Sequence, residues 1–439
     1  MRARHADPAE GEVPEQRRIL AVLVLSQILS GAGLAAGITV GALLAEEMLG
    51  STGLAGVPSA LFTAGAALGA VGIGQVCRRR GRRPGLALGY AVGALGSLGV
   101  VVAAALGQAL LLFASLFVYG AGTATNLMAR YAGADLASSA RRGRAVSTVL
   151  FATTLGAVIG PNLVTLTGRV AHSWGIPRLA GPFLLAVAAF GAAAVVLAVL
   201  LRPDPLRLAE KLAAAQAGTA AEGPGDEGGG GPDARPEARP DRRGVVTGTG
   251  IMVLTQLVMI AVMTMTPVHM QAHGHGTQAA GWVIALHVGA MFLPSPLTGL
   301  LVDRVGRRWI AGASGPVLLA AGVVAAAAPD SVPALAAALV LLGLGWNFGL
   351  VSGTALVTDA LPPARRASAQ GLVDVGIALA GATGGMLSGP VVVLAGYPTL
   401  ALAGGILAMA LIPVLAWAAR RPPHPVTAPA APLTETEQT

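Results

Sequence analysis

The sequence predicts an all-α integral membrane protein with twelve transmembrane helices, arranged as two pseudo-symmetric six-helix halves. Three observations support this fold class: the composition, the number of long apolar stretches and an internal repeat. Of 439 residues, 54% are hydrophobic and only 11% are charged, whereas soluble domains carry about 25% charged residues. The 61 glycines are typical of helices that pack closely in lipid.

Twelve stretches are long and apolar enough to cross a bilayer core of roughly 30 Å, which takes about 20 helical residues. They lie near residues 19–44, 53–76, 84–107, 109–130, 145–168, 179–201, 246–269, 279–302, 309–328, 333–358, 368–394 and 397–418. The first six form a predicted N-terminal half (19–201), and the last six form a C-terminal half (246–418). Residues 1–18 and 419–439 are predicted cytoplasmic tails. Residues 202–245, rich in Gly, Pro and charge, are predicted to be a disordered cytoplasmic linker.

The arginines predict how the chain is oriented in the membrane. Lys211 is the only lysine among the 29 basic residues, and only Arg169 and Arg178 fall in loops on the side opposite the termini. Basic residues collect on the cytoplasmic side, so both termini are expected there, in a multi-pass protein of the plasma membrane. Because the charge is explained by topology, we expect the partners to be the lipid bilayer and a small solute. We expect no nucleic-acid partner. We also expect the protein to be a monomer.

The two halves share landmarks at nearly constant offsets. GQVCRRRGRRPG (74–85) aligns with GLLVDRVGRRWI (299–310), and DLASSARRGRA from Asp135 aligns with DALPPARRASA from Asp359. GAVIGP (156–161) is echoed by GMLSGP (385–390). A repeat of six helices joined by a long linker is an architecture of secondary transporters, with the substrate site at the interface of the halves.

At these residues the chain resembles the major facilitator superfamily, over about 400 residues. GLLVDRVGRR is similar to the loop signature of that family, and its glycines, acid and arginines can form a charge-assisted latch against neighbouring helix ends. The first half departs from the pattern because Arg78 occupies the position of the acid. The predicted gating loop consists of Gly299, Asp303, Arg304, Gly306, Arg307 and Arg308.

The sequence lacks three common enzyme motifs. GxxxxGK[ST] cannot occur around Lys211, and neither HExxH nor GxSxG is present. These absences exclude an ATP-driven cassette, a zinc protease of the HExxH type and a nucleophile elbow. We therefore expect no enzymatic activity and no resident cofactor. We expect transport to be driven by a gradient of an ion or of the substrate.

Methionine and histidine are concentrated in one window. Ten of the 18 Met and His residues lie within 252–291. Met259 and Met263 share one face of the seventh span, and His287 and Met291 share one face of the eighth. If these antiparallel spans are neighbours, the four side chains form two layers, and thioether and imidazole suit Cu(I). Core packing by methionine is the alternative interpretation.

The pair MxxxM and HxxxM resembles the CcoA-like copper importers of the superfamily. The resemblance implies that Met259, Met263, His287 and Met291 bind copper as the transported substrate, although relatives in that group carry riboflavin. At the predicted external end, HMQAHGH could collect metal or could be a solvated loop. The residues concerned are His269, Met270, His273 and His275.

A proton-coupled exporter of drugs or other organic solutes is the alternative function. GxxxGP in the fifth span resembles part of the antiporter signature of such exporters, but its echo in the eleventh span also fits a packing element. Asp374 is the main candidate for a site that binds and releases the coupled proton. The alternative is that its charge complements the helix dipole at the N-terminus of the eleventh span. Candidates to line a central cavity are Asn126, Asn162, Trp346 and Asn347.

Overall fold

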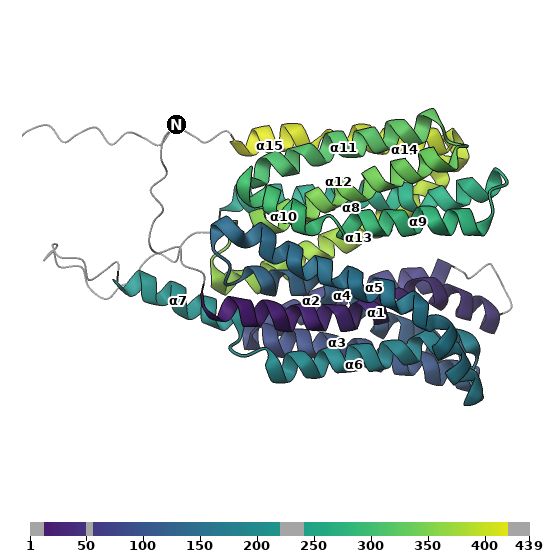
Figure 1. Ribbon diagram of the computed structural model, residues 1–439, viewed down its shortest axis with the longest axis horizontal. Coiled ribbons are helices and arrows are strands. Elements are labelled where there is room, and N and C mark those ends of the chain that lie inside the picture. Colours follow the sequence, from purple (N-terminus) through teal and green to yellow (C-terminus); the bar gives the residue numbers. More distant parts are fainter. Residues whose placement is uncertain (1–12, 50–55, 220–240, 420–439) are drawn as a thin grey trace, which may run out of the picture.

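The computed structural model describes residues 13–49, 56–219 and 241–419, and over these ranges the chain is helical, with no strand. The long helices run side by side along the long axis of the molecule, with α1–α6 in one half and α8–α15 in the other (Figure 1). Eleven stretches of the described residues are long and apolar enough to cross a membrane. The predicted span that is not among these eleven, the fifth (145–168), falls within the continuous helix α5.

The N-terminal half consists of six long helices and two short 3-10 turns. Its apolar core joins residues of α1, α3, α4 and α6. The helices are α1 (Glu15–Leu49), α2 (Gly56–Arg80), α3 (Arg82–Leu106), α4 (Ala109–Ala134), α5 (Arg142–Ser173) and α6 (Gly181–Leu200), and the turns are η3 (Ser139–Arg141) and η4 (Arg178–Ala180).

The C-terminal half has its own core, and two of its predicted spans are divided into two helices. The eighth span breaks between α9 and α10, where Pro294 and Pro296 remove backbone N–H donors. The helices are α8 (Arg242–Ala272), α9 (Thr277–Phe292), α10 (Ser295–Arg304), α11 (Arg307–Ala327), α12 (Val332–Ala360), α13 (Pro363–Ala395), α14 (Tyr397–Ala408) and α15 (Leu411–Ala419).

Glycines allow the helices to approach backbone to backbone. A Cβ atom at Gly69 of α2 would lie 2.3 Å from the carbonyl oxygen of Ala121 in α4. A Cβ atom at Gly122 of α4 would lie 2.2 Å from the Cα atom of Gly93 in α3. These distances are too short for any larger residue, which explains the high glycine content by helix packing.

The predicted linker is partly helical, so the expectation of a disordered segment over 202–245 was wrong for its first part. Helix α7 (Pro205–Thr219) begins directly after the N-terminal half. Leu206 is buried, and Arg207 donates to the carbonyl oxygen of Arg79 at the end of α2. The apolar pattern of LRLAEKLAAA supports an amphipathic helix against the bundle, and the Gly- and Pro-rich composition of the following residues obscured it. Residues 220–240 and most of both predicted tails lie outside the described ranges.

The internal repeat is visible in the turns and ion pairs of the two halves. Gly81 and Gly306 both have positive φ, 98° and 113°. Each is followed by an arginine that pairs with the acid at the end of the fourth predicted span of its own half, which is α4 in the N-terminal half and α12 in the C-terminal half. Arg82 Nε lies 2.8 Å from Asp135 Oδ2, and Arg307 pairs in the same way with Asp359.

Candidate functional site

A central cavity of about 360 Å³ lies between the two halves. Its walls are mainly apolar, with two aromatic rings and a few polar groups from both halves. The N-terminal half contributes Phe62, Asn126 and Thr153, and the C-terminal half contributes Gln256, Phe292 and Asp374. A concave, largely apolar site with few polar groups is typical of a small-molecule pocket.

Two of the four cavity candidates lie at or directly behind this cavity. Asn126 lines it, and its Oδ1 accepts a hydrogen bond from Ser30 Oγ at 3.0 Å. The indole Nε1 of Trp346 donates to Gln256 Oε1 at 2.6 Å, and the Trp346 ring packs edge-on against Phe292. Trp346 therefore orients two lining residues and does not line the cavity itself.

The other two candidates do not contribute described side chains to the cavity. Asn347 Nδ2 donates to the Met291 carbonyl oxygen and to Ser295 Oγ, both at 2.7 Å, and so joins α12 to α9 and α10. Asn162 lies in α5, and its side chain is outside the described part of the structure.

Asp374 faces the cavity and forms an ion pair that crosses between the halves. Its Oδ1 lies 2.7 Å from Nη2 of Arg130 in α4, and the Tyr131 hydroxyl donates to the same oxygen at 3.2 Å. Both charged side chains are buried, and Oδ2 of Asp374 is buried without a hydrogen-bond partner among the described residues. A buried charge needs a partner, and this ion pair joins α4 of the N-terminal half to α13 of the C-terminal half.

The four predicted copper ligands occupy the core of the C-terminal half. Met259 and Met291 are buried core residues, and Met263 packs against the same core. Helix α9 packs mainly against α12 and only slightly against α8. Helices α8 and α9 are in contact, and the facing of the two pairs across that contact stays a prediction.

His287 is fully buried and points toward α12. Its Nδ1 lies 2.7 Å from the Leu339 carbonyl oxygen, which can only accept, so Nδ1 carries the proton. Its Nε2 is buried without a partner among the described residues. In this tautomer Nε2 presents a lone pair, as metal-binding histidines do.

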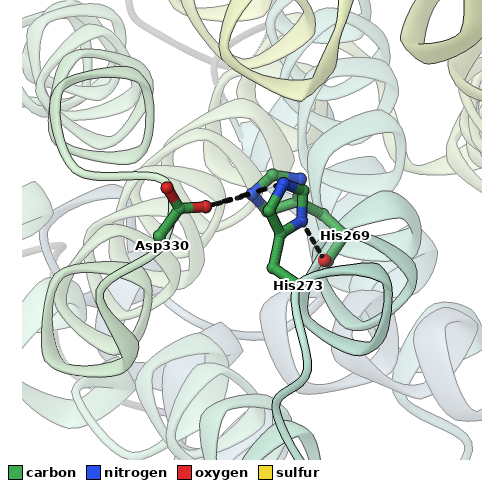
Figure 2. A group of neighbouring side chains, drawn as sticks. All are labelled: His269, His273 and Asp330. Carbon is green, nitrogen blue, oxygen red and sulfur yellow. Dashed lines mark hydrogen bonds and ion pairs between the residues drawn. The ribbon is translucent and has the colours of Figure 1, made fainter.

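The histidines at the end of α8 meet an acid that the sequence analysis did not include (Figure 2). Nε2 of His269 and Nε2 of His273 each lie 3.7 Å from Oδ1 of Asp330, in the turn between α11 and α12. His275 Nε2 contacts the Asp330 carbonyl oxygen at 3.0 Å. Met270 is fully buried in the core and does not join the cluster.

The predicted gating loop contacts the other half. Asp303 Oδ1 accepts from the Gly143 N–H at 2.8 Å, and its Oδ2 accepts from the Arg144 N–H at 3.0 Å. These are among the first N–H groups of α5, which have no partner within the helix. Gly299 lies at the crossing of α10 and α5, where a Cβ atom would be 2.6 Å from the Gly143 carbonyl oxygen. Arg304 and Arg308 are exposed.

Two reciprocal ion pairs strengthen the same contact. Arg142 of the N-terminal half pairs with Asp359 of the C-terminal half. At the symmetry-related place, Arg366 Nη1 donates to the Asp135 carbonyl oxygen at 3.1 Å and lies 4.0 Å from Asp135 Oδ1. Each acid is therefore bound by an arginine of its own half and by one of the other half, which closes this end of the molecule beneath the cavity.

The comparison with known families identifies the family. The family model described as Major Facilitator Superfamily matches residues 23–277 and 248–436. The chain belongs to the major facilitator superfamily. It is therefore a multi-pass membrane protein and a secondary transporter of small solutes, not an enzyme.

Sequence relatives within the superfamily cover nearly the whole chain. The uncharacterized MFS-type transporter YdeG of Bacillus subtilis is 54% identical over 406 residues, covering 92% of this chain and 93% of that protein. The riboflavin transporter RfnT of Brucella anthropi is 31% identical over 403 residues, covering 91% of this chain and 95% of that protein.

Solved structures of the superfamily share the fold. The human organic anion transporter MFSD10 has a TM-score of 0.72 at 16% identity, over 92% of this chain and 100% of that one. The proton:xylose symporter XylE has a TM-score of 0.70 at 18% identity, over 91% of this chain and 95% of that one.

Three residues of the sites described above were not predicted from the sequence. Arg130 lies at the end of the fourth predicted span, and an ionisable group in a span is a functional candidate. Gln256 is a polar residue within the seventh span and could have been found in the same way. Asp330 lies in a short loop, and nothing in the sequence connects it with His269 and His273.

Proposed function

We propose that the chain transports a planar organic solute of the flavin class through the central cavity. The observation that carries the proposal is the lining of that cavity. Phe62 and Phe292, one from each half, offer aromatic surface, while Gln256 and Asn126 offer hydrogen-bonding groups. Aromatic rings and a few polar groups suit a heterocycle with amide-like edges. The 31% identity to the riboflavin transporter RfnT supports the same class.

The closed end of the molecule supports transport by alternating access. Asp303 and the reciprocal ion pairs hold the halves together below the cavity. A solute in the cavity contacts both halves, so it can favour their rearrangement only through contacts that differ between the two states. Residues at the interface of the halves are therefore expected to decide both affinity and turnover.

Riboflavin uptake tests this proposal. A bacterium that can neither make nor import riboflavin would express the unmodified chain, Phe292→Ala or Gln256→Ala, and labelled uptake would be measured at matched membrane abundance. We expect uptake by the unmodified chain and at least about tenfold lower uptake by each variant, since each removes a lining contact worth on the order of 1.4 kcal/mol or more.

Val393→Ala is the matched control, because Val393 is 85% exposed on α13 and far from the lining. It should transport like the unmodified chain. Absence of riboflavin uptake by the unmodified chain would contradict the flavin class, and equal uptake by all variants would contradict the central cavity as the site.

We further propose that protons drive transport through Asp374. The support is its position: a buried carboxylate at the cavity, with one oxygen paired to Arg130 across the halves and the other without a partner. Protonation would remove the charge that holds Arg130 and loosen α4 from α13. Buried carboxylates in spans are typical proton relays.

Copper import is the second candidate function, and one observation favours it. His287 is buried with its Nδ1 proton held by the Leu339 carbonyl oxygen, so a lone pair is available at Nε2. Three methionines belong to the same core. Soft thioether and imidazole ligands select Cu(I).

Cellular copper content separates the two candidates. In a bacterium deficient in copper uptake, the unmodified chain should raise copper content if this function holds, and His287→Ala and Met263→Ala should abolish the rise. Met386→Ala is the control, because Met386 is an exposed methionine of α13 and not a predicted ligand. A rise that persists in both ligand variants, or no rise with the unmodified chain, would rule out this candidate.

A further inference from the structure

Three side chains of the types that bind metals lie together at the end of the molecule opposite the predicted gating loop. His269 and His273 are one turn apart at the end of α8 and so share a face. Asp330 reaches them from the turn between α11 and α12 (Figure 2). One ligand atom from each of the three residues lies within 4.8 Å of the others.

The distances fit a small divalent cation. Both Nε2 atoms are 3.7 Å from Asp330 Oδ1. Ligand atoms about 2.0–2.1 Å from a tetrahedral Zn²⁺ are about 3.4 Å apart, so the two distances between histidine and acid exceed that spacing by only a few tenths of an ångström. His273 is 46% exposed and Asp330 is 68% exposed, which leaves both free to adjust.

Neighbouring groups already orient the two rings. His273 Nδ1 contacts the His269 carbonyl oxygen at 2.8 Å, so Nδ1 carries the proton and Nε2 faces Asp330 with its lone pair. Such a backbone carbonyl partner is the usual second contact of a metal-binding histidine. The His269 ring stacks on Tyr397 of α14 at 4.5 Å, and the Tyr397 hydroxyl lies 2.9 Å from Thr266 Oγ1.

We propose that His269, His273 and Asp330 form a binding site for a divalent cation of the Zn²⁺ class, which joins the end of α8 to the turn before α12. Two imidazoles disfavour Ca²⁺ and Mg²⁺, which take oxygen ligands. The carboxylate distinguishes the site from a soft Cu(I) site. On binding, the ion replaces the proton with which His269 Nε2 contacts the Pro329 carbonyl oxygen, and the proton moves to Nδ1, so that His269 binds the ion as a neutral imidazole.

An ion at the proposed site would restrain the end of α8. Pro267 interrupts the hydrogen-bond ladder of α8 two residues before His269. Further along the helix, Gln256 and Ile260 line the central cavity. A bound ion therefore fixes the segment of α8 beyond Pro267, independently of which solute the cavity takes.

Direct metal binding tests the site without a transport assay. The full chain would be purified in detergent through a tag without histidines, and Zn²⁺ alone would be the probe, measured by calorimetry and by metal content after dialysis. We expect one high-affinity ion per chain, and an affinity at least about tenfold lower in His273→Ala and in Asp330→Asn, since loss of even an outer-shell partner costs about 10–100-fold.

His172→Ala is the matched control, because His172 is an exposed histidine at the end of α5, outside the cluster. It should bind Zn²⁺ like the unmodified chain. Zn²⁺ should also raise the melting temperature of the unmodified chain and of His172→Ala, but not of Asp330→Asn. No stoichiometric binding to the unmodified chain, or equal binding by His273→Ala and Asp330→Asn, would overturn the proposal.

Discussion

At the residue scale, the ion pair between Arg130 and Asp374 is the most informative feature of the molecule. It is buried, it crosses between the halves, and it borders the cavity. A buried ion pair contributes little net stability, but removing one partner leaves a buried charge without compensation. The pair is therefore suited to a role in the transport cycle more than to holding the fold together.

The first prediction concerns coupling at Asp374. Asp374→Asn keeps the size of the side chain but cannot gain or lose a proton at neutral pH. In proteoliposomes, accumulation driven by a pH gradient should fall to the level of protein-free liposomes, while exchange of labelled for unlabelled solute persists. The measurement uses the solute identified by the uptake assay. Gradient-driven accumulation that survives in Asp374→Asn would exclude this residue as the coupling site.

The second prediction concerns the stability of the same pair. Arg130→Gln leaves the Asp374 carboxylate buried without its cation, which should cost about 3–5 kcal/mol. The double variant Arg130→Gln/Asp374→Asn removes both charges and should regain part of that loss. Melting temperatures in detergent would report both effects. A double variant that melts lower than Arg130→Gln would contradict this account.

At the scale of helices, the crossing of α5 and α10 decides how closely the halves approach at the gate. Asp303 accepts from the N-terminus of α5, and Gly299 lies against Gly143 in the same crossing. A side chain at Gly299 would meet backbone, which cannot move aside as the end of a flexible side chain can. The loop signature therefore combines a charged contact with a requirement for close approach.

The third prediction follows from this crossing. Gly299→Ala should force α10 away from α5 and favour opening of the gate. Ala367→Cys in a Cys77→Ser background is the reporter, because Ala367 on α13 is fully buried against the N-terminal half. Alkylation should be faster with Gly299→Ala than without it. Gly312→Ala is the control, since its Cβ atom would be at an ordinary 3.6 Å from Leu415 Cδ1, and equal rates in both variants would refute the prediction.

At the scale of the whole molecule, the two halves contain equivalent turns and equivalent ion pairs. Arg82 with Asp135 and Arg307 with Asp359 are equivalent within the halves. Arg142 with Asp359 and Arg366 with Asp135 are equivalent between them. All of these charges lie at one end of the bundle, so the same residues can orient the protein in the membrane and close the cavity.

The fourth prediction tests that orientation. In a Cys77→Ser background, Trp174→Cys lies in a predicted external loop and Arg304→Cys in a predicted cytoplasmic one, and both positions are exposed. An impermeant maleimide should label Trp174→Cys in intact cells, and Arg304→Cys only after the membrane is opened. The positive-inside distribution is the physical reason. The reverse pattern would contradict both the predicted orientation and the cytoplasmic termini.

The sequence alone determined the fold class, the helical spans and the repeat, because each depends on local properties of the chain. A run of about 20 apolar residues must form its hydrogen bonds within a helix in lipid, and equivalent motifs mark equivalent helices. The composition also predicted close packing through glycine. The helical start of the linker was missed because its amphipathic pattern is short and lies beside Gly- and Pro-rich sequence.

Only the tertiary structure decided which side chains meet. Helix α9 packs mainly on α12, and His287 Nδ1 contacts the Leu339 carbonyl oxygen of that helix, a partner that the spacing of Met and His does not indicate. Asp330 joins two histidines and Arg130 joins Asp374 across long separations in the chain. Hydrophobic periodicity reports which face of a helix is buried, whereas the partner of a buried charge or a metal ligand depends on the packing of helices distant in sequence.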